Sequence, residues 1–326
     1  MTFSAKMAFW HYDFLGQFMV FDKFADMPVG PIYRSLLQKA VRRGVTHVAS
    51  ATVKKLILDK DLAWLRARLG VISFEECWAQ VPNLNFSTDA SSLLAQYGEV
   101  SGLEKNKNAA GLGALAYELS LGDRTVYSVA SEAIKDLRIV GEANKRPEAF
   151  WSWIKSLDLN ERQMLSVLNS ESGYKLAGWP WDKSFAIATA YLSVFSDKVT
   201  VKDSANVNCE DFPYWTAIDK HTPQGKVALS HCSQVFKIDR QLLGWVQFYV
   251  ESAKCGSLQN SIWWEREKKW RLSKFGLDWA EAELIWSKVA PFFEDYFVSC
   301  AAQLHADLQL AENIYNKELI YQGNLI

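Results

Sequence analysis

The segment 217–226 carries the residues best suited to chemistry. It reads Ala-Ile-Asp-Lys-His-Thr-Pro-Gln-Gly-Lys. Thr222 followed by Pro223 is the pattern of an N-cap and a first-turn proline, so a helix should begin here. The free N–H groups of its first turn would suit a phosphate or carboxylate, since Gly225 leaves room for a ligand and Lys226 adds a positive charge.

Two side chains of the same segment could move a proton or orient a ligand. Asp219 and His221 flank Lys220, and an imidazole with its ordinary pKa of about 6.5 can act as acid or base at neutral pH. We therefore predict Asp219 and His221 as catalytic candidates, and Lys220 and Lys226 as cations that bracket the ligand. The alternative is an ordinary capped helix in which Asp219 and His221 bond to the backbone.

A second pair of acids follows an apolar run. Glu75 and Glu76 come directly after Leu-Gly-Val-Ile-Ser-Phe at 69–74. Paired carboxylates at the end of a buried helix can act as general bases, so both are catalytic candidates. They could instead be the solvated end of that helix, or pair with Arg66 and Arg68.

Two basic segments are candidates for nucleic-acid contact. Arg42 and Arg43 end one helical segment, and Lys268 and Lys269 lie in the tryptophan-rich segment 263–271. Basic residues interleaved with aromatic ones can follow phosphates and stack on bases, and neutralising each should weaken binding to all DNA sequences alike. The seven-residue spacing of tryptophans in this region is also typical of a helix that faces a core.

Helices must position these residues. Apolar residues recur at helical spacing over 31–43, 61–80, 109–121, 125–140, 181–195, 238–254, 259–272 and 277–320. We expect a kink or break near Gly70 and another near Pro291, and Asn160 with Gln163 predicts a further helix start. Strand signals are limited to a short alternation at 199–201. The sequence predicts an all-α fold, a multi-helix globular bundle with little or no sheet.

The long polar stretch 197–214 is the best internal boundary. It predicts a helical body over 1–196, an irregular connector over 197–214, and a tryptophan-rich helical C-terminal part over 215–326 that packs on the body.

Composition excludes several classes of protein. Lys and Arg number 36 against 37 Asp and Glu, a net charge of −1, which excludes a polybasic nucleic-acid binder but not a local basic face. The five cysteines form no C-x-x-C pair, which argues against a disulfide framework or zinc ribbon and suits a reducing compartment. Neither a signal peptide at 1–10 nor a membrane-spanning apolar run is evident. We expect a cytoplasmic protein with no membrane partner, metal or cofactor.

Motifs of nucleotide-binding and hydrolytic enzymes do not occur. The chain has no P-loop, no dinucleotide-binding glycine motif, no H-E-x-x-H and no G-x-S-x-G. We therefore expect that ATP is neither bound tightly nor hydrolysed.

Three segments together resemble one protein family. They are Leu-Leu-Gln-Lys-Ala-Val-Arg-Arg-Gly at 36–44, Trp-Leu-Arg-Ala-Arg-Leu-Gly-Val-Ile-Ser-Phe-Glu-Glu at 64–76, and Ile-Asp-Lys-His-Thr-Pro-Gln-Gly-Lys at 218–226. They look like the C-terminal helical region of the MgsA/RarA (Werner-helicase-interacting protein) AAA+ ATPases, in a stand-alone phage or bacterial form. Glu76 stands at an Asp position of that family, and Cys77-Trp78 replace its usual Val-Gly. The resemblance implies a helical fold like a clamp-loader collar and a role at DNA forks or in phage–host conflict, without ATP hydrolysis.

A weaker resemblance covers residues 108–122. This segment is similar to the hairpin of helix-hairpin-helix DNA glycosylases, in which Gly111 and Gly113 would free backbone N–H groups for a DNA phosphate. The catalytic Asp of that family would fall near Ala130, where Glu132 and Asp136 are the nearest acids. A glycine-tolerant helix packed closely on a neighbour is the alternative.

Three functions stay open. The first is a DNA-acting helical protein without its own ATPase, in genome maintenance, DNA repair or antiviral defence, with DNA and a replication or defence protein as partners. The second is a DNA glycosylase-like enzyme that flips a modified base into an aromatic pocket and excises it; the 14 tryptophans favour it. The third is a helical scaffold for a protein partner.

Overall fold

The computed structural model describes residue 27 and residues 30–86, 89–196, 199–204 and 209–323. Over these ranges the fold is all-α, as the sequence predicts: isolated bridges occur, but no β-strand. The segment 1–10, where we find no signal-peptide pattern, lies outside these ranges, as do 197–198 and 205–208 of the predicted connector.

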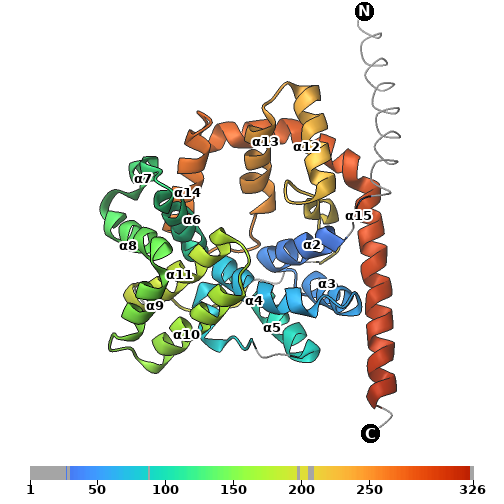
Figure 1. Ribbon diagram of the computed structural model, residues 1–326. Coiled ribbons are helices and arrows are strands. Elements are labelled where there is room, and N and C mark those ends of the chain that lie inside the picture. The colour runs from blue at the N-terminus through green and yellow to red at the C-terminus, as the bar shows by residue number, and fades with distance from the viewer. Residues whose placement is uncertain (1–26, 28–29, 87–88, 197–198, 205–208, 324–326) are drawn as a thin grey trace, which may run out of the picture.

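Figure 1 labels the helices and shows how they are arranged in space. In chain order they are α2 (Gly30–Arg43), α3 (Thr46–Leu58), α4 (Leu62–Glu76), α5 (Ala90–Gly102), α6 (Asn108–Ser120), α7 (Tyr127–Ala130), α8 (Ile134–Lys145), α9 (Pro147–Lys155), α10 (Glu161–Leu176), α11 (Pro180–Phe195), α12 (Pro223–Phe236), α13 (Arg240–Val246), α14 (Ile262–Ser273) and α15 (Trp279–Gly323). A π-helical turn over Gln247–Ser252 continues α13.

Local sequence signals set several helix starts correctly. The side chain of Asn160 accepts a hydrogen bond from the backbone of Gln163, whose side chain bonds back, which completes a capping box at α10. The hydroxyl of Thr222 caps α12 by accepting from the N–H of Gly225 at 3.1 Å. A break is wrong at both expected positions, because α4 runs through Gly70 and α15 continues through Pro291. Figure 1 shows that α15 nevertheless changes direction, between its orange-red part beside α13 and α12 and its long red part on the right.

Helix α6 is central because its residues are small. Residues 109–116 are all buried and include Gly111 and Gly113. Helices α8, α11 and α14 pack directly against it. A Cβ on Gly111 would lie 2.3 Å from the carbonyl of Trp263, so the absence of a side chain permits the close approach of α14.

We therefore predict that Gly111→Ala destabilises the protein by about 2 kcal/mol, because α14 must move away from α6. The matched control is Gly98→Ala in α5, where the nearest atom to a new Cβ is 4.0 Å away. That variant should gain about 0.5 to 1 kcal/mol from its higher helix propensity. Equal effects of the two substitutions in urea unfolding would disprove the close contact.

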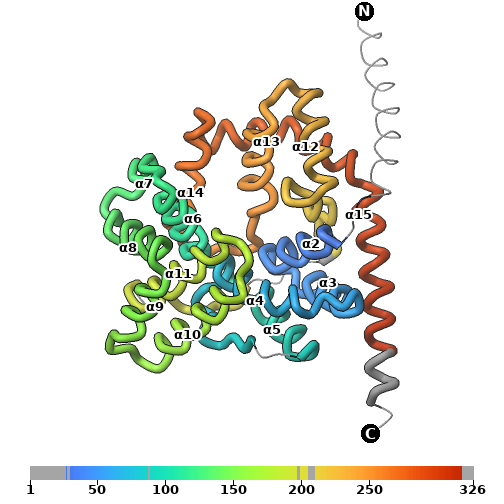
Figure 2. Tube along the Cα trace, viewed as in Figure 1, coloured from blue at the N-terminus to red at the C-terminus, as the bar shows by residue number. Residues whose placement is uncertain are grey.

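Each of the two clusters of the hydrophobic core contains residues from before and after the connector 197–214. One cluster joins buried residues of α2 to α5 with those of α12, α13 and α15, and the other joins α6 to α11 with Trp263 and Trp270 of α14. Segments far apart in the sequence lie side by side: in Figure 2 the blue segment of α2 lies beside the gold segment that precedes α12. Residues from both ends of the chain are thereby brought together.

No helix in the described part of the chain combines the length and apolar character needed to cross a bilayer.

Candidate functional site: an aromatic pocket

A pocket of about 680 Å³ lies where these distant segments meet. Its walls come from α2, α4, α6, α11 and α14, from the turn before α12, and from α13 with its π-helical extension. Aromatic side chains dominate the apolar surface: Trp64, Trp179, Trp181, Phe185, Trp245, Phe248 and Trp264. Wide aromatic walls with a few polar groups are typical of sites for planar ligands.

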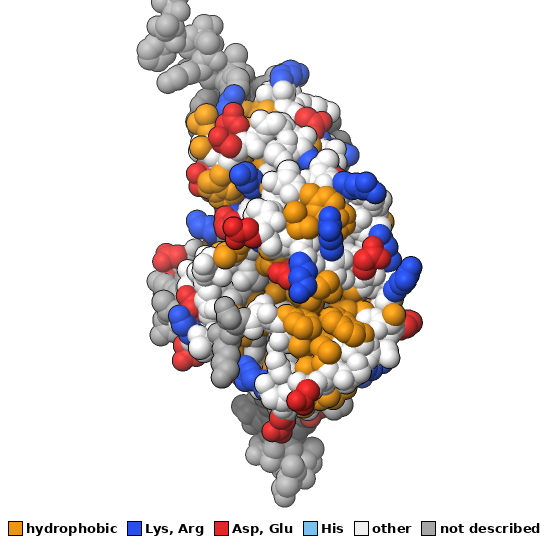
Figure 3. Space-filling model, turned by 90° about the vertical axis from the view of Figure 1, so that its left-hand side faces the viewer, with side chains coloured by type: hydrophobic (Ala, Val, Ile, Leu, Met, Phe, Trp, Pro, Cys, Tyr) orange, Lys and Arg blue, Asp and Glu red, His pale blue; other side chains and the backbone are white. Residues whose placement is uncertain are grey.

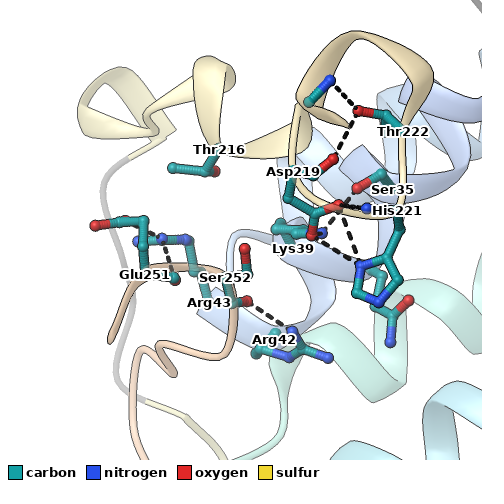
Figure 4. Close-up of polar contacts among 12 residues, drawn as sticks. Ser35, Lys39, Arg42, Arg43, Thr216, Asp219, His221, Thr222, Glu251 and Ser252 are labelled. Atoms are coloured by element: carbon teal, nitrogen blue, oxygen red, sulfur yellow. Dashed lines mark hydrogen bonds and ion pairs between the residues drawn. The ribbon is translucent and has the colours of Figure 1, made fainter. Parts of the chain in front are cut away.

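One side of the pocket is the turn that carries Asp219 and His221, and the two side chains lie in contact there (Figure 4). The Asp219 carboxylate lies 3.2 Å from Nδ1 of His221 and accepts from the backbone N–H of that residue at 2.9 Å. It also forms an ion pair with Lys39 of α2. Burial alone would raise the pKa of Asp219, but Lys39 and His221 outweigh it and hold that pKa well below its usual value.

The two residues have different positions relative to the pocket. Asp219 is 1 % exposed and lies behind the wall, whereas His221 lines the pocket with its side chain 59 % exposed. Asp219 therefore positions His221 and charge-balances Lys39, while only His221 can reach a ligand. The Thr222 cap and the bond of Asp219 to the backbone N–H of His221 agree with the alternative of an ordinary capped helix, and the contact between the two side chains is additional to them.

The cap itself gives a further prediction. Thr222 is buried, and its hydroxyl also donates to the carbonyl of Asp219 at 3.0 Å. Replacing Thr222 with Ala should cost about 1 kcal/mol, since the N–H of Gly225 loses its acceptor. Thermal unfolding of Thr222→Ala and Thr222→Ser would check this, and a Ser variant as unstable as the Ala variant would contradict it.

Glu75 and Glu76 also differ in position: one lines the pocket and the other is buried behind it. Glu75 lines the pocket and accepts hydrogen bonds from Arg68 of α4 at 3.3 Å and from Arg42 of α2 at 3.1 Å. Glu76 is fully buried behind it, 2.6 Å from Nε of Arg42 and 3.0 Å from Nζ of Lys107. Glu75 remains a catalytic candidate. The prediction for Glu76 needs correction, because two cations enclose its carboxylate away from any ligand.

Arg42 and Arg43 do not form an exposed basic patch. Arg42 is 2 % exposed and also donates to the carbonyl of Ser252 at 2.6 Å. Arg43 pairs with Glu251 at 2.5 Å (Figure 4). The Arg-Arg pair therefore ties α2 to the π-helical turn, and the expected contact of these two residues with phosphates is corrected.

Two acidic residues that the sequence reasoning missed complete the pocket. Asp182 in the first turn of α11 lies 2.8 Å from Arg68, and burial raises its pKa to about 6 despite that cation. Glu267 of α14 is 2 % exposed, and its Oε1 accepts from the Tyr249 hydroxyl at 2.5 Å. Its other oxygen, Oε2, has no hydrogen-bond partner among the described residues, and burial raises the pKa of this carboxyl.

A sequence signal for Glu267 existed. Trp264, Glu267 and Arg271 recur at intervals of three and four, so an acid stands on the apolar face of α14. Asp182 gave no such signal, because an acid in a helix first turn is ordinary.

The remaining predicted residues lie away from the pocket. Gly111 and Gly113 are buried inside α6, and the N–H of Gly111 donates to the carbonyl of Lys107 at 3.0 Å. Because they lie inside a hydrogen-bonded helix, they offer no free N–H to a phosphate. The alternative of a closely packed helix therefore fits Gly111 and Gly113 better than a phosphate site does. Lys226 and Lys269 are exposed on other surfaces, and Lys268 pairs with Glu265 and lies over the ring of Trp279.

The face shown in Figure 3 mixes charges of both signs with patches of hydrophobic side chains. On this face Lys and Arg do not form a continuous stripe.

Among the described residues, no group of three or more His, Cys, Asp or Glu side chains is arranged to hold a metal ion. The pocket presents aromatic rings together with acid–base groups. Comparison with protein-family models, characterised proteins and solved structures finds no match to this chain.

Proposed function

We propose that this protein acts on DNA by accepting a nucleobase into the aromatic pocket and hydrolysing the bond between that base and its deoxyribose. The observation that supports the proposal is the combination of tryptophan walls with buried carboxyl groups in one pocket. Enzymes that excise a base must take it out of the helix and stack it between aromatic or apolar side chains. The volume of about 680 Å³ is sufficient for one flipped nucleotide.

The carboxyl groups suit the steps of such a hydrolysis. Asp182, with its pKa near 6, is present in both protonation states around neutral pH and can donate a proton to the departing base. Glu75 offers a carboxylate that would stabilise the positive charge developing on the sugar. His221, oriented by Asp219, can accept a proton from the attacking water.

The proposal keeps the wider interpretation of a DNA-acting protein without ATPase activity. A role in genome maintenance or antiviral defence, a replication or defence protein as partner, and action in the cytoplasm are parts of the same proposal. They follow from the resemblance to the MgsA/RarA helical region and from the need for a modified base as substrate.

The test is incubation of the purified protein with single- and double-stranded oligonucleotides that each contain one deaminated, alkylated or oxidised base. Mass spectrometry should detect a free base, and alkali should cleave the strand at the abasic site. Glu75→Gln should release the base at least about 100-fold more slowly, whereas Glu142→Gln on the exposed surface of α8 should act like the wild type. Intact bases in every oligonucleotide across pH 5 to 9 would reject the proposal.

A further inference from the structure

Among the described residues that line the pocket, Lys220 is a charged side chain without an ion pair. The described residues provide it with no ion pair or hydrogen bond; instead its Nζ lies 3.0 Å from the ring centroid of Trp245 and 4.6 Å from that of Phe248. The turn that carries it is held rigidly, because Thr222 donates to the carbonyl of Asp219 from both its N–H and its hydroxyl. An amine is thus presented to the pocket by a fixed backbone.

The unpartnered oxygen of Glu267 is a second, independent observation at the same wall. Glu267 and Lys220 both line the pocket, and the charge of Glu267 acts on Lys220. A buried carboxyl oxygen without a partner is costly, so its place at a pocket wall indicates a ligand group that completes its hydrogen bonding.

We propose that Lys220 is a nucleophile that forms an imine with an aldehyde whose planar group stacks on the aromatic wall, and that Glu267 transfers the protons. The neutral amine attacks the carbonyl carbon, and a C–N bond forms as the carbonyl oxygen takes up a proton. The carbinolamine then loses that oxygen as water, with a proton supplied by the Glu267 carboxyl, as the C=N bond forms. The nitrogen gives up its remaining proton, which restores the Glu267 carboxyl. One water leaves for each imine, and no oxidant or reductant is consumed.

The electrostatics of the wall favour this step. Burial lowers the pKa of Lys220 to about 7, with Arg271 of α14 and Lys39 of α2 acting in the same direction and Asp219 and Glu267 opposing them. About half of the amine is then neutral at pH 7, roughly a thousandfold more than for an ordinary lysine. Desolvated lysines in apolar pockets are activated as Schiff-base nucleophiles in this way.

The experiment is reductive trapping of the wild-type protein with benzaldehyde and sodium cyanoborohydride at pH 7. We expect one benzyl group per chain, mapped to Lys220 by peptide mass spectrometry and added at least about tenfold faster than at any other lysine. The rate should rise as the pH increases from 6 to 8 and then level off. Acetaldehyde, which cannot stack, should label Lys220 more slowly than benzaldehyde does.

Two substitutions complete the test. Lys220→Arg keeps a cation over Trp245 but has no nucleophilic amine, so the fast label should disappear, while Lys226→Arg on the exposed side of α12 should leave it unchanged. Labels spread over surface lysines at equal rates would overturn the proposal, and the wild-type peptide map decides this even if Lys220→Arg does not fold. The result is independent of base excision, because benzaldehyde is not a nucleobase.

Discussion

Glu76→Gln is expected to lower the free energy of unfolding by about 3 to 5 kcal/mol. The substitution keeps the size of the side chain but removes the charge that Arg42 and Lys107 share, and both cations are at most 2 % exposed. Lys107 would then lack its ion-pair partner, and Arg42 would keep only its pair with Glu75. Urea unfolding followed by tryptophan fluorescence measures the loss.

The pH dependence of stability gives the same prediction a second readout. Burial would raise the pKa of Glu76, but Arg42 and Lys107 outweigh it and lower that pKa below its ordinary value of 4.5. Its stabilising contribution is therefore complete above about pH 4.5 and is lost as the pH falls through the lower folded-state pKa. The Gln variant should lack this part of the acid transition. The exposed Glu142→Gln should change stability by less than about 0.5 kcal/mol, and a similarly small change for Glu76→Gln would contradict the ion-pair account.

Asp182→Asn is expected to slow base release by at least about 100-fold. The substitution removes the proton donor while it preserves the shape of the first turn of α11. In the wild type the protonated form of Asp182 declines as the pH rises through about 6, so the rate of base release should fall over that range. The Asn variant should show a low rate without that fall.

A structural role for Asp182 would give a different pattern. The variant would then unfold at lower temperature but release the base at the wild-type rate per folded molecule, with the same pH profile. Asp158→Asn, at an exposed position before α10, is the control for the substitution itself and should leave both properties unchanged.

The helices were predictable because their signals are local. The Asn160 capping box, the Thr222 cap and the apolar spacing of 31–43 depend on residues within one or two turns of each other. The continuity of α15 beyond Pro291 was not predictable from the local pattern, because a proline removes one helical hydrogen bond and usually ends or kinks a helix.

The site was predictable only in part, for a related reason. Asp219 and His221 are two residues apart, so their contact could be inferred, but the ion pair of Asp219 with Lys39 joins α2 to a turn 180 residues away. Packing of distant segments also buries Arg42 beside Glu76. The residue that the sequence indicates as a phosphate contact is therefore part of a buried ion pair. Sequence spacing alone does not show which charges will meet in this way.

The most direct test of the account is to locate a DNA base on the protein by photo-cross-linking. A single-stranded oligonucleotide with one 4-thiothymine, which needs no unpairing, is irradiated with the protein, and the cross-linked peptide is identified by mass spectrometry. The account predicts cross-links to the pocket wall formed by Trp245, Phe248 and Trp264, and their loss when Trp245 is replaced by Ala in a variant that still folds. Cross-links confined to the outer surfaces of α8 to α10, unchanged in Trp245→Ala, would contradict it.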